Sequence, residues 1–294
     1  MSVNRIEDRQ RTLSILEKIL NSSKPELVGR IPGGLSLQAM TAYLHKRGFS
    51  PSQKEEIAAL TGFFSAPSTY EENLYAYANA ELSALRRSTL CLRNSTDSED
   101  VALLLESIVD GYVSDVHVWS SDNIRSWVPL LEGKRVLIVS AFAETMAQQW
   151  AKRKNLHNTH PEIKKRFDFP EFDAVFIQSP LTVTGCEPFT YTSWNEAFHH
   201  LCMKVDQVHS YDVALLSCGA YAMPLGGHIL DSGNTAWNVG GILQTVFGIR
   251  GNRWSRAVSD ISGYYNSAWV DPSIEETPKY HPSARPDWDN FWRV

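Results

Sequence analysis

The chain has 294 residues, of which 43% are hydrophobic and 21% are charged, and its net charge is −5. This composition is typical of an ordinary globular protein with a sizeable core. The acidic balance argues against a nucleic-acid partner, because surfaces that bind nucleic acid are generally basic. The four cysteines lie far apart without a CxxC pair, as expected for reduced thiols in the cytosol.

Nothing in the sequence indicates export or membrane insertion. The first 20 residues include acids and lack a continuous apolar segment, so they do not resemble a signal peptide. A run of about 18 apolar residues is also absent, so we expect no transmembrane segment.

The N-terminal part, residues 1–120, is predicted to be rich in helix. Apolar spacing predicts a helix over 4–20, and residues 26–31 (ELVGRI) indicate a short strand that ends in the turn Pro32-Gly33-Gly34. Further helices are expected at 35–47, from Ser50-Pro51 onward, at 70–86 and at 98–111. Short strands are expected at 89–92 and 116–119.

Residues 121–294 alternate more regularly between strands and helices. The segment 134–140 (KRVLIVS) is apolar at successive positions, which is typical of a parallel strand covered on both faces. Strands at 172–177, 213–216 and 235–239 follow, with helices after 140 and from the capping box Ser193–Glu196 to about 209. This order predicts an α/β fold with a Rossmann-like, mainly parallel sheet flanked by helices. The proline-rich segment after Trp254 predicts a tail that wraps the domain edge or closes over a site.

Two glycine-rich turns follow strands of this predicted sheet. Cys218-Gly219-Ala220-Tyr221 comes after the strand 213–216, and Gly240-Gly241 comes after the strand 235–239. Ligands of open α/β sheets bind where strands end, glycine allows close backbone approach, and helix N-termini favour anions. The two turns therefore predict a phosphate-binding edge, with tight turns and close helix–strand packing as the alternative.

Glu144 follows the strand 134–140 at the same kind of edge. Its carboxylate is a candidate general base or a ligand for a sugar hydroxyl. An acid that merely stabilises the first turn of a helix is an equal alternative. Other chemistries are disfavoured, because Ser140 and Ser217 lack a GxSxG context, Cys218 has no linked histidine, and GxGxxG, GxxxxGK[ST] and HExxH are absent.

The segment from Cys218 to Trp254 resembles a C-terminal signature of proteins encoded in bacterial surface-polysaccharide clusters. That signature has a Cys-Gly-Ala-Tyr-Gly-x-Pro-Leu turn and then Gly-Gly-x-x-Gln-x-x-Phe-Gly-Ile-x-Gly-x-Arg-Trp. The segments VLIVSAFAETMAQQW and YYNSAWVDPSIEETP are similar to other parts of the same group, so the resemblance extends over about residues 26–292. The group is in turn distantly similar to glycosyltransferases of the GT-D fold, which is Rossmann-like and uses a nucleotide-sugar donor.

The resemblance implies a cytoplasmic glycosyltransferase of surface-polysaccharide biosynthesis, with peripheral association at the inner membrane as an alternative. It would move a sugar from a nucleotide-sugar donor to a glycan or lipid-linked acceptor, with Glu144 as the base. Tyr221 or Trp237 would flank the base or the sugar of the donor. Together with the glycine turns, the resemblance gives these donor-binding residues: Arg30, Gly33, Gly34, Cys218, Gly219, Ala220, Tyr221, Gly240, Gly241, Gln244, Arg250, Arg253 and Trp254.

The chain departs from the GT-D pattern where a divalent metal would bind. Members of that fold carry an Arg-x-Gly-Asp-Gly-Glu type of turn whose acids serve the metal, whereas residues 30–36 here (RIPGGLS) keep the arginine and the glycines without an acid. We therefore expect no tight metal site in this turn. A metal-free enzyme, a metal held through Glu144, and a non-catalytic nucleotide-binding, sugar-binding or assembly protein remain open. A different sugar-nucleotide enzyme is a weaker alternative.

Overall fold

The computed structural model describes residues 5–31, 46, 48–51, 54, 57–58, 61–93, 112–114, 126–157, 169–182, 190–251, 254 and 261–277. The expected helix at 98–111, the expected strand at 116–119 and nearly all of the expected helix at 35–47 lie outside these ranges. Among the candidate site residues, Gly33, Gly34 and Arg253 lie outside them as well.

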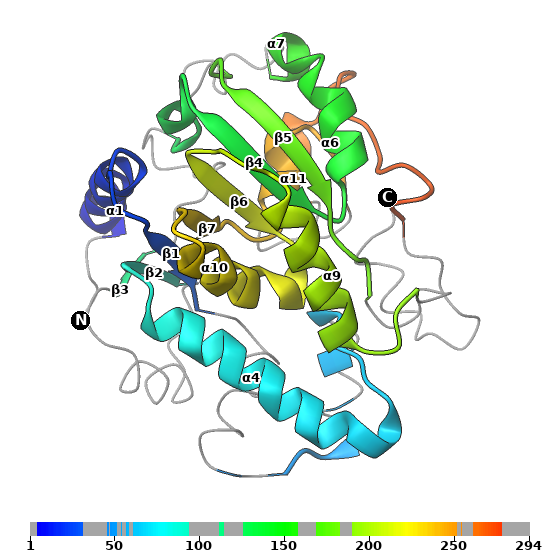
Figure 1. The fold of residues 1–294 in the computed structure, drawn as a ribbon. Coiled ribbons are helices and arrows are strands. Elements are labelled where there is room, and N and C mark those ends of the chain that lie inside the picture. The colour runs from blue at the N-terminus through cyan, green and yellow to red at the C-terminus, as the bar shows by residue number, and fades with distance from the viewer. Residues whose placement is uncertain are drawn as a thin grey trace.

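In the described part of the chain, seven strands form one sheet in which every neighbouring pair is parallel (Figure 1). Their spatial order is β3-β2-β1-β7-β6-β4-β5, so the last strand of the sequence lies in the middle, beside the first. This arrangement confirms the predicted Rossmann-like α/β fold. The strands are β1 (Leu27–Arg30), β2 (Leu90–Arg93), β3 (Tyr112–Ser114), β4 (Arg135–Ser140), β5 (Asp173–Gln178), β6 (Val213–Ser217) and β7 (Ala236–Asn238).

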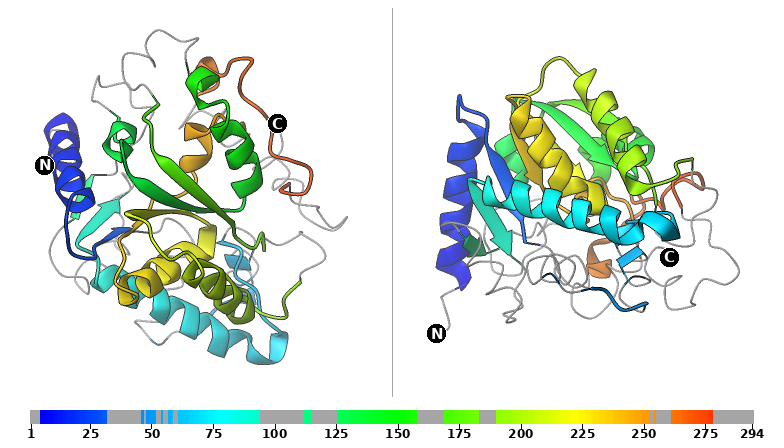
Figure 2. Two further views of the ribbon diagram at one scale, coloured as in Figure 1. Left: turned by 45° about the horizontal axis from the view of Figure 1, so that its top comes forward. Right: turned by 60° about the horizontal axis from the view of Figure 1, so that its bottom comes forward.

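Helices cover both faces of the sheet (Figures 1 and 2). One layer, here called the α4 layer, contains α4 (Tyr70–Arg86), α9 (Trp194–Asp206) and α10 (Ala222–Asp231). The other, the α6 layer, contains α1 (Arg5–Leu20), α6 (Ala143–Trp150), α11 (Leu243–Val246) and residues of the C-terminal segment 261–277. No helix among the described residues has the length and apolar character needed to cross a membrane.

Short helices complete the described structure. The helix expected directly after β4 is divided into α6 and α7 (Arg153–Leu156). The 3-10 turns are η1 (Pro67–Thr69), η2 (Val128–Leu131), η3 (Gly219–Tyr221) and η5 (Ser262–Tyr264). The serine half of the capping box predicted for α9 is present: the Ser193 hydroxyl accepts the Glu196 N–H at 3.3 Å. The Glu196 carboxylate accepts the N–H of Thr192.

The central strands are apolar at successive positions because both of their faces are buried. Leu137 and Val139 of β4 pack in the core of the α4 layer, whereas Val136 and Ile138 pack in the core of the α6 layer. All four side chains are fully buried. Complete burial of one such side chain contributes roughly 1.5–3 kcal/mol. The uninterrupted apolar run therefore identifies a strand between two helical layers.

The strand register brings the predicted turns to one edge of the sheet. Leu216 of β6 lies opposite Asn238 of β7, and the N–H of Gly240 donates to the Leu216 carbonyl at 3.1 Å. Because neighbouring strands are parallel, Cys218 and Gly240 follow their strands at the same carboxyl edge. This was the arrangement expected from the repeated pattern of an apolar run followed by glycine.

Candidate functional site

The chain leaves the ends of β4 and β6 in opposite directions. From β4 it enters α6 in one layer, and from β6 it enters η3 and α10 in the other layer. Because β4 and β6 are neighbours, their carboxyl ends form a topological switch point, where ligands of open α/β sheets bind. The candidate site, here called the switch-point edge, consists of the turns 141–145 and 218–221 and the adjacent end of β7.

Gly219 has the backbone conformation and the packing that only glycine accepts. Its φ is +57°, in the left-handed region. A Cβ atom at this position would lie 2.9 Å from the Thr61 carbonyl oxygen. The missing side chain therefore permits the approach of the segment that contains Thr61. Gly219 itself is exposed, so its backbone remains accessible to a ligand.

The side chains beside Gly219 belong to the core. Cys218 and Ala220 are both buried, and burial raises the pKa of the Cys218 thiol far above its usual range. The thiol therefore stays protonated, which is unsuitable for a nucleophile. If these two residues contact a donor, they do so through the backbone.

Tyr221 lies in the core of the α4 layer instead of presenting its ring at the edge. Its hydroxyl is 2.7 Å from the Thr182 hydroxyl, which in turn donates to the Gly62 carbonyl at 2.6 Å. Its ring stacks on Trp194 with centroids 5.7 Å apart and planes 10° apart. Burial raises the pKa of this phenol well above its usual range. The role expected for Tyr221 beside the donor does not fit this position.

Trp237, the alternative aromatic residue, is also buried. It lies on β7 with 1% of its surface exposed, and its ring centroid is 4.7 Å from that of Trp127. The indole therefore belongs to the core of the α6 layer, where it is not available to stack on a donor.

Arg30 and Gly240 meet at the end of β1. The Arg30 Nη1 donates to the Val239 carbonyl at 2.8 Å, and a Cβ atom on Gly240 would lie 2.9 Å from the same nitrogen. Gly240 has a φ of +73°, and both Gly240 and Gly241 are partly exposed. The following helix, α11, has four residues, so its dipole is weak. Positive charge at this turn comes from the Arg30 side chain.

Glu144 is exposed in the first turn of α6, at the switch-point edge. Within the described residues, no hydrogen bond or ion pair involves its carboxylate. A group in this position can exchange a proton with a ligand, because solvent reaches it and no described residue holds its carboxylate. Gln148, one turn further along α6, is exposed as well.

Glu276 is a residue of this edge that sequence reasoning missed. It comes from the C-terminal segment and is 2% exposed. Its carboxylate accepts the N–H of Glu144 at 2.8 Å, the N–H of Thr145 at 3.1 Å and the Thr145 hydroxyl. These donors include helix-start N–H groups that have no partner within α6. A weak signal was available in an acidic pair followed closely by a proline, IEETP.

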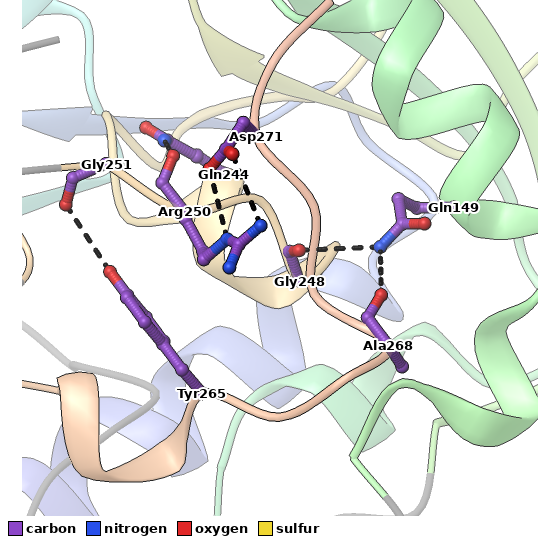
Figure 3. Close-up of polar contacts among 8 residues, drawn as sticks. All are labelled: Gln149, Gln244, Gly248, Arg250, Gly251, Tyr265, Ala268 and Asp271. Carbon is purple, nitrogen blue, oxygen red and sulfur yellow. Dashed lines mark hydrogen bonds and ion pairs between the residues drawn. The ribbon is translucent and has the colours of Figure 1, made fainter. Parts of the chain in front are cut away.

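Polar residues of the signature stabilise the segment after α11 (Figure 3). The buried Gln244 donates through Nε2 to the Arg250 carbonyl at 2.7 Å and accepts from the Trp254 indole at 3.3 Å. Arg250 forms an ion pair with Asp271, with Nε 3.0 Å from Oδ1. Gln244, Arg250 and Trp254 were expected to bind the donor. They instead connect parts of the polypeptide.

The C-terminal segment packs along this stabilised region (Figure 3). Gln149 of α6 donates to the Ala268 carbonyl at 2.9 Å and to the Gly248 carbonyl at 3.4 Å. Ile249 and Val270 form a parallel bridge. The signature and the downstream tail, which are separate in the sequence, are therefore one structural unit beside α6.

Ser217 is a second residue that sequence reasoning did not assign to a ligand. It ends β6 opposite Ser140 of β4, which lies opposite Gln178 of β5. The Ser140 hydroxyl accepts the Phe142 N–H, and Gln178 donates to the Ala141 carbonyl. Ser217 is partly exposed, and its hydroxyl has no hydrogen bond to another described residue. It is therefore available to a ligand at the switch point.

Most of the turn 30–36, where the sequence lacks the acids that would bind a metal, lies outside the described residues. Among the residues that are described, no group of three or more His, Cys, Asp or Glu side chains could hold a metal ion.

Comparisons with protein-family models, with curated proteins and with solved structures found no match. The resemblance to surface-polysaccharide proteins therefore depends on the motifs quoted above. Among the described residues, the carboxyl edge of the parallel sheet presents the exposed Glu144 carboxylate, the partly exposed Ser217 hydroxyl and the Arg30 guanidinium.

Proposed function

We propose that this protein is a glycosyltransferase that moves a sugar from a nucleotide-sugar donor during surface-polysaccharide biosynthesis in the cytoplasm. The observation that carries the proposal is the position of Glu144, exposed at the switch point of an all-parallel sheet. Its segment is similar to one of the surface-polysaccharide group. Glycosyl transfer requires a base beside the acceptor hydroxyl, and this carboxylate is suited to that role.

In this mechanism, Glu144 removes the proton from a hydroxyl of the glycan or lipid-linked acceptor. The acceptor oxygen then bonds to the anomeric carbon, and the bond from that carbon to the diphosphate breaks. The nucleoside diphosphate departs with the electron pair, and the configuration is inverted. Arg30 and exposed backbone N–H groups would stabilise the developing negative charge.

The packing narrows the set of proposed donor contacts. Arg30, the backbone of Gly219, the pair Gly240-Gly241 and the Ser217 hydroxyl are at least partly exposed. They lie at the ends of β1, β6 and β7. In the proposal, these groups bind the diphosphate and the sugar. Arg250 is paired with Asp271, and its contribution would require that pair to open.

A second candidate function is a non-catalytic nucleotide-binding, sugar-binding or assembly protein. Two observations favour it. The turn 30–36 has no acid for a metal, and Gln244 and Trp254 are occupied in internal contacts. Such a protein would bind a nucleotide or a sugar at the same edge without turnover.

The experiment that separates these functions has two stages. Nucleoside diphosphates and nucleotide sugars are titrated by calorimetry with and without Mn²⁺, and release of nucleoside diphosphate is then followed with glycan acceptors. Binding with turnover supports the glycosyltransferase, binding without turnover supports the second candidate, and the absence of binding rejects both.

A matched pair of arginine variants locates the binding site. Arg30→Gln should weaken nucleoside-diphosphate binding by about tenfold or more, because a charge-assisted contact is lost. Arg135→Gln removes the same charge from the opposite end of the sheet, where β4 begins, and should leave binding unchanged. Equal effects of the two variants would place the nucleotide elsewhere.

A further inference from the structure

The start of α6 is held by a carboxylate that is distant in the sequence. Glu276 is 132 residues from Glu144, yet its Oε1 accepts the Glu144 N–H at 2.8 Å. The two oxygens also receive the N–H and the hydroxyl of Thr145. Glu276 therefore contacts the backbone of the residue that the proposed function uses as its base.

A buried carboxylate is stable in this position. Glu276 is 2% exposed, and the unpaired N–H groups and the positive dipole end of an eight-residue helix compensate for its lost hydration. Hydrogen bonds to an ionised acceptor are also about twice as strong as neutral ones. The contact is therefore strong enough to fix the first turn of α6.

The segment around Glu276 is itself fixed. The N–H of Ser273 donates to the Thr145 hydroxyl oxygen at 3.0 Å, so Thr145 is bound from two sides. Within the segment, the Glu276 N–H donates to the Ser273 carbonyl at 3.1 Å, and Thr277 donates to the same carbonyl at 2.8 Å. The C-terminal segment and the first turn of α6 thus form one unit (Figure 1).

We propose that Glu276 is a positioning residue, which acts on the reaction through Glu144. By holding the N–H groups of Glu144 and Thr145, it fixes the backbone from which the Glu144 carboxylate extends to the switch-point edge. This inference rests on the proposed function, because it assigns catalytic consequences to the position of Glu144. As a consequence, turnover requires the C-terminal segment to remain bound to the first turn of α6.

The first test measures the backbone directly. In Glu276→Gln one oxygen and the charge are lost, so amide hydrogen exchange at residues 144 and 145 should accelerate by about tenfold or more. Glu275→Gln is the control, because it removes the same charge from an exposed neighbour in the same segment. The milder Thr145→Val, which keeps both backbone donors, should cause a smaller acceleration. Unchanged exchange in Glu276→Gln would overturn the inference.

The second test separates positioning from a merely structural role. With a nucleotide sugar that the wild-type protein turns over, Glu276→Gln should lower kcat about tenfold or more, because misplaced catalytic groups lose rate. KM for the nucleotide sugar should stay within about twofold, since no donor contact is changed. A thermal unfolding curve checks that the variant is still folded at the temperature of the assay.

The outcomes distinguish this inference from the proposed function. Faster exchange with a lowered kcat supports positioning, whereas faster exchange with an unchanged kcat overturns it and leaves a structural contact. A wild-type protein that binds and turns over no nucleotide sugar contradicts the proposed function itself. In that case the catalytic role of Glu276 is rejected together with it.

Discussion

The two turns that meet at the switch point differ in what they offer to a ligand. In the turn 218–221, the side chains of Cys218, Ala220 and Tyr221 are buried in the α4 layer, and only the Gly219 backbone is exposed. In the turn 141–145, the side chain of Glu144 is exposed, and a buried acid from the C-terminal segment holds the backbone. The difference teaches that a conspicuous glycine motif can serve packing, whereas a less conspicuous turn can present an exposed carboxylate.

The same contrast applies to acidic residues in the two layers. Glu81 of α4 is buried in the α4 layer, and its Oε2 has no hydrogen-bond partner among the described residues. Glu144 of the α6 layer is exposed. Burial of Glu81 favours its neutral form, because a charged carboxylate loses its hydration in the core. Four predictions test this comparison, from the largest expected effect to the smallest.

The largest effect should be a pH dependence of stability that originates at Glu81. Burial raises its pKa from 4.5 to about 8, against a smaller opposing effect of a hydrogen bond with Tyr77. The folded state therefore holds the proton more tightly than the unfolded state. The resulting stability is complete below pH 4.5 and is lost as the pH rises through about 8. The loss should be on the order of 4 kcal/mol.

Urea unfolding between pH 5 and pH 9 measures this effect. Glu81→Gln should remove the loss of stability that this carboxyl causes as the pH rises, because the amide does not titrate. Glu72→Gln is the control, since Glu72 is exposed in the first turn of the same helix. If the slope of Glu81→Gln equals that of the wild type, Glu81 does not control the pH dependence.

The second prediction concerns Gly219. Gly219→Ala should lower the free energy of unfolding by roughly 3 kcal/mol, through backbone strain and contact with the Thr61 carbonyl. Gly133→Ala is the matched control, because Gly133 has a φ of +72° with no atom within 4 Å of its Cβ position. It should cost only about 1–2 kcal/mol, from strain alone. Equal losses in urea unfolding would remove the packing explanation for Gly219.

The third prediction concerns the exposed acid. Glu144→Gln should reduce turnover of a nucleotide sugar by about 100-fold or more, as is typical for a lost acid–base group. Its unfolding free energy should fall by only ~0.3–1 kcal/mol, the contribution of an acid in a first helical turn. Adding Gln148→Glu to the Glu144→Gln variant tests whether a carboxylate one helical turn away restores part of the lost rate. An unchanged rate in Glu144→Gln would leave Glu144 as a helix-stabilising residue.

The smallest effect is expected at Tyr221. Tyr221→Phe removes one hydrogen bond to Thr182 and keeps the stacking on Trp194, so stability should fall by about 1 kcal/mol. Nucleotide affinity should not change, because the ring is buried. A loss of affinity at constant stability would return Tyr221 to the donor site.

Local sequence patterns determined the element types of this protein. The apolar run 134–140 predicted β4, and the Ser193–Glu196 capping box predicted the start of α9, because each depends on residues a few positions apart. The alternation of such elements also predicted the parallel α/β sheet. Since parallel strands end at one edge, the position of Glu144 near the glycine turns followed from the sequence as well.

Only the tertiary structure decided which residues that edge presents. Gly219 faces Thr61, Tyr221 bonds Thr182, and Glu276 binds the start of α6, and each of these partners is distant along the chain. A local pattern shows that a residue is aromatic, small or acidic, but it does not show what covers that residue after folding. Burial depends on long-range packing, and for this reason the sequence assigned Tyr221 and Gln244 to the donor site although both side chains are buried in internal contacts.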